Sequence, residues 1–79
     1  VVPHDELSSA TKELATQVAK GPAVAIMMAK RLIYGSLEEN LYKALHDHDL
    51  AAQIVGSTDD AKEGPRAWVE KREPIFKGR

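Results

Sequence analysis

Residues 21–35 read GPAVAIMMAKRLIYG, an apolar run interrupted only by Lys30 and Arg31. Pro22 suits the first position of a helix, where its missing N–H costs no hydrogen bond, and Gly35 suits the position just after the last turn. A helix that is apolar around most of its circumference belongs in a protein interior. Because 79 residues cannot easily enclose such a helix, another protein surface is expected to cover part of it.

Helix patterns flank this run, and no strand pattern follows Val2. An amphipathic helix is expected from Asp5, as its cap, to about Lys20, where Gly21 ends it. Its apolar side chains recur at three- and four-residue spacing. They are Leu7, Ala10, Leu14 and Val18. The sequence therefore predicts a surface helix with one apolar face ahead of the buried one.

A long third helix is expected after Gly35. Residues 36–39 read SLEE, a capping box that predicts a helix start, and Gly56 is expected to stop this helix after Val55. Its apolar residues form two stripes, which indicates contact with two bodies. His48 falls within one stripe, where a core histidine with a hydrogen-bond partner and a titrating group at an interface both remain open.

The end of the chain has its own start and stop signals. Residues 57–60 read STDD and predict a cap, followed by a short helix to Glu63 that the pair Gly64-Pro65 breaks. Pro65 then starts a last helix over residues 66–72, and residues 75–79 are extended after Pro74. The sequence predicts an all-α fold of four to five helices in one domain, residues 1–79.

The second and third helices carry more apolar surface than four short helices can cover among themselves. We expect the side chains of this surface to form an interface with a second copy of the chain. They are Ile26, Met28, Leu32, Ile33, Leu50 and Ile54.

Composition excludes several classes of function. There is no cysteine for disulfides or thiolate metal sites, and no apolar run approaches a membrane span. His46 and His48 are two apart on a helix and cannot chelate one metal ion together. DNA binding is disfavoured because the third helix would present acidic side chains to phosphate. No glycine-rich phosphate loop, nucleophile elbow or pair of catalytic carboxylates is present, so no catalytic residue is assigned.

Charge is distributed unevenly along the chain. Residues 1–61 carry five Lys/Arg against nine Asp/Glu, whereas residues 62–79 carry six against three. A solvated surface and a surface that meets a polyanion, such as a phosphate-bearing ligand, are both consistent with this basic end.

Three stretches together resemble the C-terminal end of the enoyl-CoA hydratase/isomerase (crotonase) family. Residues 57–78 read STDDAKEGPRAWVEKREPIFKG and resemble its closing pattern, S/T-x-D-A-x-E-G-x-x-A-F-x-E-K-R-x-P-x-F. Residues 21–32 resemble its G-P-x-A…K-x-x-L stretch, and residues 1–7, VVPHDEL, resemble the strand end and helix start before its last helices. The resemblance covers essentially all 79 residues in the right order.

The resemblance implies a fold and a function for the parent protein. Members build a core of stacked βαβ units that carries the catalytic groups, and that core would lie upstream of Val1. The last helices cap the active site and pack into a trimer or a dimer of trimers. The parent would be an acyl-CoA enzyme of the lyase class, whereas this segment alone would be inactive. Its substrate is carried as a coenzyme A thioester, with no separate cofactor and no metal.

Two positions acquire a ligand role through the resemblance. An aromatic ring and a lysine near the C-terminus hold the adenine end of coenzyme A in several members, and they correspond to Trp68 and Lys71. Simple core packing remains the alternative for Trp68. The sequence departs from the family pattern at Trp68, where phenylalanine is usual, at Pro65, where a helix former is common, and at His48, where an acid is frequent.

Other readings stay open at this stage. The first residue is Val1 and not methionine, which indicates a piece of a longer chain. A free-standing helical protein-interaction module is the alternative to an enzyme lobe. The absence of cysteine suits the cytoplasm, or the mitochondrial matrix in a eukaryote. The reaction within the family is not determined by these residues.

Overall fold

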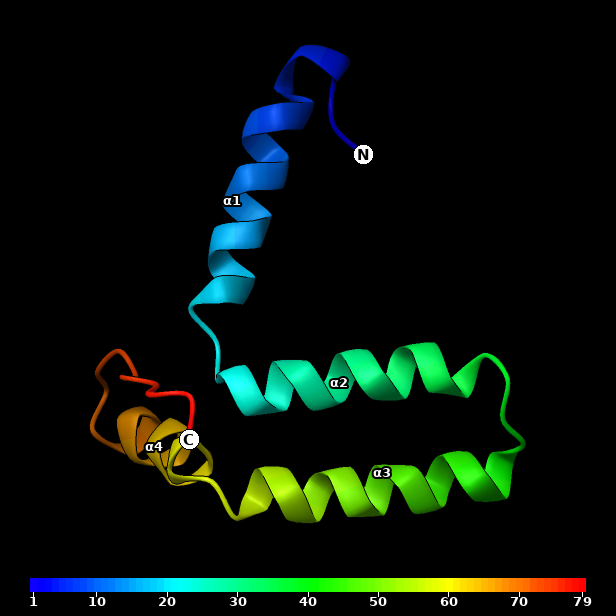
Figure 1. The fold of residues 1–79 in the computed structure, drawn as a ribbon. Coiled ribbons are helices and arrows are strands. Elements are labelled where there is room, and N and C mark those ends of the chain that lie inside the picture. The colour runs from blue at the N-terminus through cyan, green and yellow to red at the C-terminus, as the bar shows by residue number, and fades with distance from the viewer.

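The computed structural model describes residues 1–79 and contains helices and no strands, as predicted. A short 3-10 turn, η1, precedes four helices. The elements are η1 (His4–Glu6), α1 (Leu7–Ala19), α2 (Ala23–Ser36), α3 (Leu41–Gly56) and α4 (Asp59–Val69). In Figure 1, α2 and α3 run side by side in opposite directions, α4 lies at the end of α3, and α1 stands away from the pair.

The buried core is thin. Only Ala51, Ala67 and Asp60 are fully buried, in a body that measures 43 × 38 × 18 Å. The main packing is between α2 and α3, whereas α1 packs chiefly against η1. The apolar run of α2 is therefore half-covered at best, and the apolar face of α1 is open. None of the four helices is long and apolar enough to cross a membrane.

The predicted starts of the first and third helices are wrong. Asp5 lies within η1, and α1 begins at Leu7 with no side-chain cap. The capping box at Ser36 does not form, because the Ser36 hydroxyl donates to the Ile33 carbonyl at the end of α2. Asn40 caps α3 instead, its side-chain oxygen accepting from the backbone N–H of Lys43 at 2.9 Å. Residues 37–40 are needed as the loop that reverses the chain, so the helix starts later.

The predicted break at Gly64-Pro65 is also wrong, because α4 continues through both residues. Proline usually clashes with the Cβ of the preceding residue in a helix, and Gly64 has no Cβ. The cap predicted for this helix is confirmed at Thr58, whose hydroxyl accepts from the Ala61 N–H at 3.1 Å. One helix therefore replaces the two short ones expected here.

Gly21 allows the tight turn between α1 and α2. A Cβ at this position would lie 2.9 Å from Cδ1 of Ile26 and 3.2 Å from the Val18 carbonyl oxygen. Such separations are below normal van der Waals contact, so a side chain here would displace the tip of the Ile26 side chain and crowd the Val18 carbonyl. The end of the first helix at Gly21 is thus a matter of space as well as of helix propensity.

Candidate functional site

The end of α4 carries the two residues expected to contact a ligand. Trp68 lies in its last turn and is 84% exposed, so within this chain its ring is not a core side chain. Lys71 lies beyond the helix that carries Trp68, because α4 ends at Val69 and does not extend to residue 72 as expected. Lys71 instead occupies the turn that follows, with a left-handed φ of 53°.

This turn is a Schellman motif, a common way to end a helix. The N–H of Lys71 donates to the Trp68 carbonyl at 3.2 Å, and the N–H of Arg72 donates to the Ala67 carbonyl at 3.0 Å. Glycine is usual at the left-handed position of this motif, because a Cβ is strained there. A lysine at that position is therefore an outlier that invites a functional explanation.

Although Lys71 lies outside α4, the turn brings Trp68 and Lys71 to one hollow. This hollow has a volume of about 560 Å³. Its lining residues are Ala67, Trp68, Lys71, Arg72 and Glu73. An exposed indole face next to an ammonium group can stack on a planar aromatic ligand and pair with a phosphate. The arrangement suits a ligand that carries both groups.

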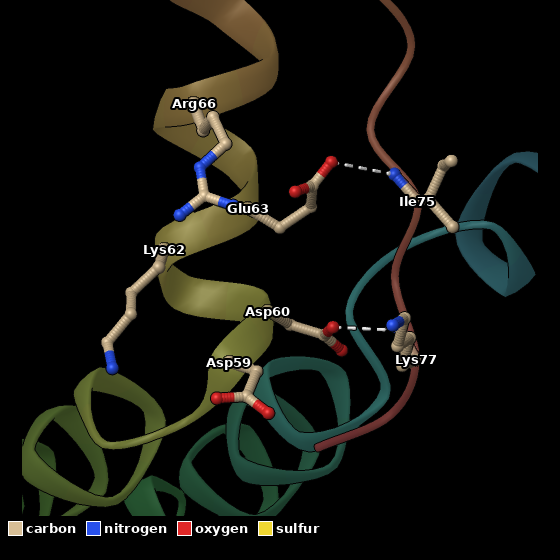
Figure 2. Close-up of a pocket in the computed structure, with 7 residues that line it drawn as sticks. All are labelled: Asp59, Asp60, Lys62, Glu63, Arg66, Ile75 and Lys77. Carbon is tan, nitrogen blue, oxygen red and sulfur yellow. Dashed lines mark hydrogen bonds between the residues drawn. The ribbon is translucent and has the colours of Figure 1, made fainter.

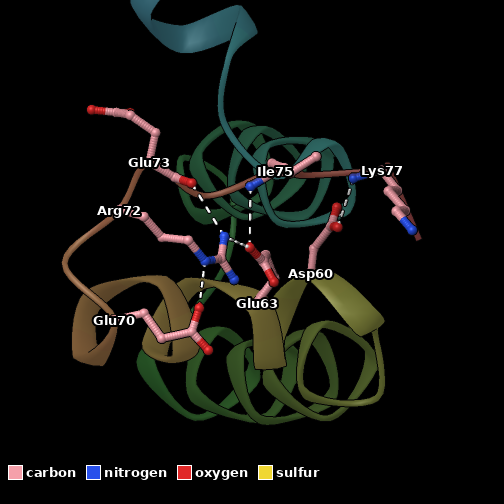
Figure 3. A network of polar contacts seen from close by, with 7 residues as sticks. All are labelled: Asp60, Glu63, Glu70, Arg72, Glu73, Ile75 and Lys77. Carbon is pink, nitrogen blue, oxygen red and sulfur yellow. Dashed lines mark hydrogen bonds and ion pairs between the residues drawn. The ribbon is translucent and has the colours of Figure 1, made fainter.

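A polar network ties the turn to α4, as Figure 3 shows. The Arg72 guanidinium donates through Nε to Glu70 and through Nη1 to Glu63, at 2.5 Å each, and Nη1 also donates to the Glu73 carbonyl. Glu63 accepts a further hydrogen bond from the Ile75 N–H at 3.2 Å. The hydrogen bond with Arg72 is the main reason that the pKa of Glu63 lies below its ordinary value of 4.5, and the hydrogen bond from the Ile75 N–H lowers it further.

Asp60 fastens the last residues of the chain to α4. Its carboxylate is almost fully buried and accepts from the backbone N–H of Lys77 at 2.8 Å (Figures 2 and 3). It also accepts from the backbone N–H of Gly78 at 2.8 Å. Its own N–H donates to the Arg79 carbonyl at 2.9 Å. Asp60 and Glu63 thus hold residues 73–79, the tail, along one side of α4. Charged side chains line most of the small hollow between helix and tail in Figure 2.

Acid should weaken this attachment. The depressed pKa of Glu63 means that its contribution to folding stability is present above pH 4.5 and is lost as pH falls through the lower folded-state value. The difference in melting temperature between the native chain and Glu63→Gln should therefore be largest near pH 7 and shrink as pH falls below 4.5. Thermal melts across this range, followed by circular dichroism, measure it. A difference that stays constant with pH would contradict the assignment.

The six residues expected at an oligomer interface separate into two surfaces. Ile26, Met28 and Leu32 are half-buried, whereas Ile33, Leu50 and Ile54 are 65, 47 and 48% exposed. A hollow between α2 and α3 is lined by four of the six. These are Met28, Leu32, Leu50 and Ile54. A second hollow, where α1 meets α2, is lined by Ile26 and Ile33 together with Val18 and Tyr34.

The structure corrects one reading of His48 and adds residues that the sequence reasoning missed. The His48 side chain is 69% exposed and lies 4.0 Å from Asp49, so it is not a core histidine of this chain. No group of three or more His, Asp or Glu side chains is placed to hold a metal ion.

Asp60, Glu63 and Arg72 were missed because their partners are backbone groups and side chains up to 18 residues away. Only the density of acidic and basic residues between 59 and 73 hinted at a network.

The family of the chain follows from its match to known proteins. The family model for enoyl-CoA hydratase/isomerase matches residues 1–79. The chain belongs to the enoyl-CoA hydratase/isomerase family. Among its relatives are a probable mitochondrial enoyl-CoA hydratase 2 of Arabidopsis thaliana, 35% identical over 84% of this chain, and a carnitinyl-CoA dehydratase of Salmonella paratyphi B, 35% identical over all of it.

Solved structures of the enoyl-CoA hydratase/isomerase family agree with the fold. An enoyl-CoA hydratase from Bacillus anthracis superposes on all of this chain with a TM-score of 0.93 at 33% identity. An enoyl-CoA hydratase/isomerase from Mycobacterium paratuberculosis superposes on 99% of it with a TM-score of 0.87 at 35% identity. The chain spans 22% of the Arabidopsis protein, 32% of the Salmonella protein and 31% of each solved chain.

Proposed function

We propose that these 79 residues are the C-terminal helical lobe of an acyl-CoA enzyme, in which they cap the active site, join subunits and contact coenzyme A. The observation that carries the proposal is the exposed Trp68 ring beside Lys71 at one open hollow. The family match over residues 1–79 supports an enzyme lobe over a free-standing interaction module. The names of the relatives, a hydratase and a dehydratase, support a lyase-type reaction for the whole protein.

Coenzyme A combines the two groups that this hollow suits, an adenine ring and several phosphates. Stacking on Trp68 needs an exposed ring face, and 84% of that residue is free in this chain. Core packing, the alternative for Trp68, finds no support within the 79 residues. The ammonium of Lys71 takes part in no ion pair in the structure, which leaves it available to a phosphate.

The joining role rests on the apolar faces that the chain leaves open. The hollow where α1 meets α2 has a volume of about 490 Å³, and five of its six lining residues are hydrophobic. Exposed apolar surface of this extent marks a protein–protein contact. We propose that α2 and α3 pack against a second copy of the complete enzyme. The mitochondrial relative supports a mitochondrial location in a eukaryotic host.

Trp68→Ala in the complete enzyme is the test of the coenzyme A contact. A stacked base is worth about 1–3 kcal/mol, so KM for the acyl-CoA should rise about fivefold or more. Turnover should change little, because the adenine is remote from the reacting carbons. Steady-state kinetics measure both constants.

Trp68→Phe is the matched control, since it keeps an aromatic face and should hold KM near the native value. A Trp68→Ala enzyme that loses its oligomeric state, with an unchanged KM, would instead show that Trp68 packs against protein.

A further inference from the structure

Lys71 and Arg72 are adjacent cations with different surroundings. The three hydrogen bonds of the Arg72 guanidinium run to Glu63, Glu70 and the Glu73 carbonyl, so its charge is compensated inside the chain. The Lys71 ammonium has no ion-pair partner. Of the two, only Lys71 presents an uncompensated charge to the hollow that both residues line.

The network of Arg72 encloses the turn that has Lys71 at its apex. Glu70 and Arg72 stand on either side of Lys71, and the ion pair between them ties the two ends of the turn together. Glu63 anchors the pair to the body of α4. The same carboxylate holds the Ile75 N–H, so the chain is fixed on α4 at a second point beyond the turn.

Strain makes this anchoring necessary. A lysine with a φ of 53° occupies a conformation that residues with a Cβ disfavour, so the turn relaxes unless surrounding contacts hold it. The side-chain contacts that hold the turn are those of Arg72 with Glu63 and Glu70. A turn held in this way keeps Lys71 at the hollow that Trp68 also lines, at a reduced entropic cost of binding.

We propose that Glu63, acting through Arg72, is a positioning residue that aims the Lys71 ammonium at the phosphates of the coenzyme A nucleotide. This inference rests on the coenzyme A contact proposed above. Glu63 touches no ligand itself. Its effect on substrate binding is confined to the part of the substrate that Lys71 meets, which distinguishes this role from its contribution to folding stability.

The experiment compares two substrates in the complete enzyme: an acyl-CoA, and the matching acyl-pantetheine thioester, which lacks the nucleotide. Lys71→Gly should raise KM for the acyl-CoA about tenfold or more, the loss expected for one charge-assisted contact. It should also raise the melting temperature, because glycine suits a positive φ. Glu63→Gln should raise the same KM about two- to fourfold, since the contact survives but is less well oriented. Neither variant should change KM for acyl-pantetheine or kcat for either substrate.

Glu38→Gln is the control for Glu63→Gln, because Glu38 is exposed in the loop before α3 and forms no ion pair. It should leave every constant unchanged. If Glu63→Gln fails to fold, Arg72→Lys replaces it, because lysine keeps the charge but cannot bridge Glu63 and Glu70 in the same geometry.

Each remaining outcome decides between the proposals. A Lys71→Gly effect without a Glu63→Gln effect would overturn the positioning role and leave the coenzyme A contact standing. Equal losses on both substrates in Glu63→Gln would make Glu63 a structural residue only. An unchanged KM for acyl-CoA in Lys71→Gly would reject the contact itself, and the positioning role with it.

Discussion

Replacing Asp60 with alanine is expected to lower the free energy of unfolding by about 2–5 kcal/mol, because two hydrogen bonds to a buried, charged acceptor are lost. Asp60 is only 3% exposed, and its carboxylate accepts from the N–H groups of both Lys77 and Gly78. It also lies in the first turn of α4, where a negative charge is favourable. Without it, the tail should detach and expose the donors to water.

Urea denaturation of native and variant chains measures this loss. Asp59→Ala is the matched control, because that neighbouring carboxylate is 71% exposed and meets only Arg79, at 3.9 Å. An exposed pair of this kind contributes about 0–1 kcal/mol. Asp60→Asn should fall between the two, since an amide offers one acceptor oxygen where the carboxylate offers two. Equal losses for Asp59→Ala and Asp60→Ala would show that the tail does not depend on Asp60.

The isolated 79-residue chain is expected to show no turnover of an enoyl-CoA. Hydration of a thioester needs donors that stabilise the developing oxyanion and a positioned acid–base pair. Within the chain, Asp60 and Glu63 are engaged by backbone N–H groups and Arg72, and they are not available for acid–base chemistry. A coupled or direct thioester assay with purified chain measures this. Turnover above the buffer rate would contradict it.

The same isolated chain should self-associate. Only three of its residues are buried, while large apolar side chains such as Leu14, Ile33 and Leu45 are more than half exposed. A helix as short as α1 is marginal in water without packing partners, so its open face seeks one. Sedimentation velocity at high micromolar concentration should show species larger than a monomer. A folded monomer under these conditions would argue against the open faces as association surfaces.

Local chemistry was enough to predict several parts of the fold. The apolar run of α2 between Pro22 and Gly35, and the Thr58 cap of α4, depend on backbone preferences and on hydrogen bonds within three or four residues. The same holds for the all-α class, because helix signals follow one another without a strand pattern. The family, with Trp68 and Lys71 as candidate ligand residues, came from the resemblance of three stretches and not from any of these patterns.

The errors occurred where two local signals competed. Ser36 and Asn40 are both good caps, and the loop needed to turn α3 back along α2 selected Asn40. Pro65 signals a helix start or a break, and the absence of a Cβ on Gly64 let α4 run through. His48 matched an apolar stripe by periodicity, yet its side chain is 69% exposed in this chain.

The sequence by itself determined the all-α class, the Thr58 cap of α4 and the basic character of residues 62–79, because these depend on residues close together in the chain. Only the tertiary structure decided that Arg72 is neutralised by Glu63 while Lys71 stays free, and that Asp60 holds the tail. Those contacts join residues 9 to 18 positions apart, and they form only after the Schellman turn has folded the chain back along α4. Periodicity within one helix carries no information about that reversal, so the same two cations look equivalent until the chain is folded.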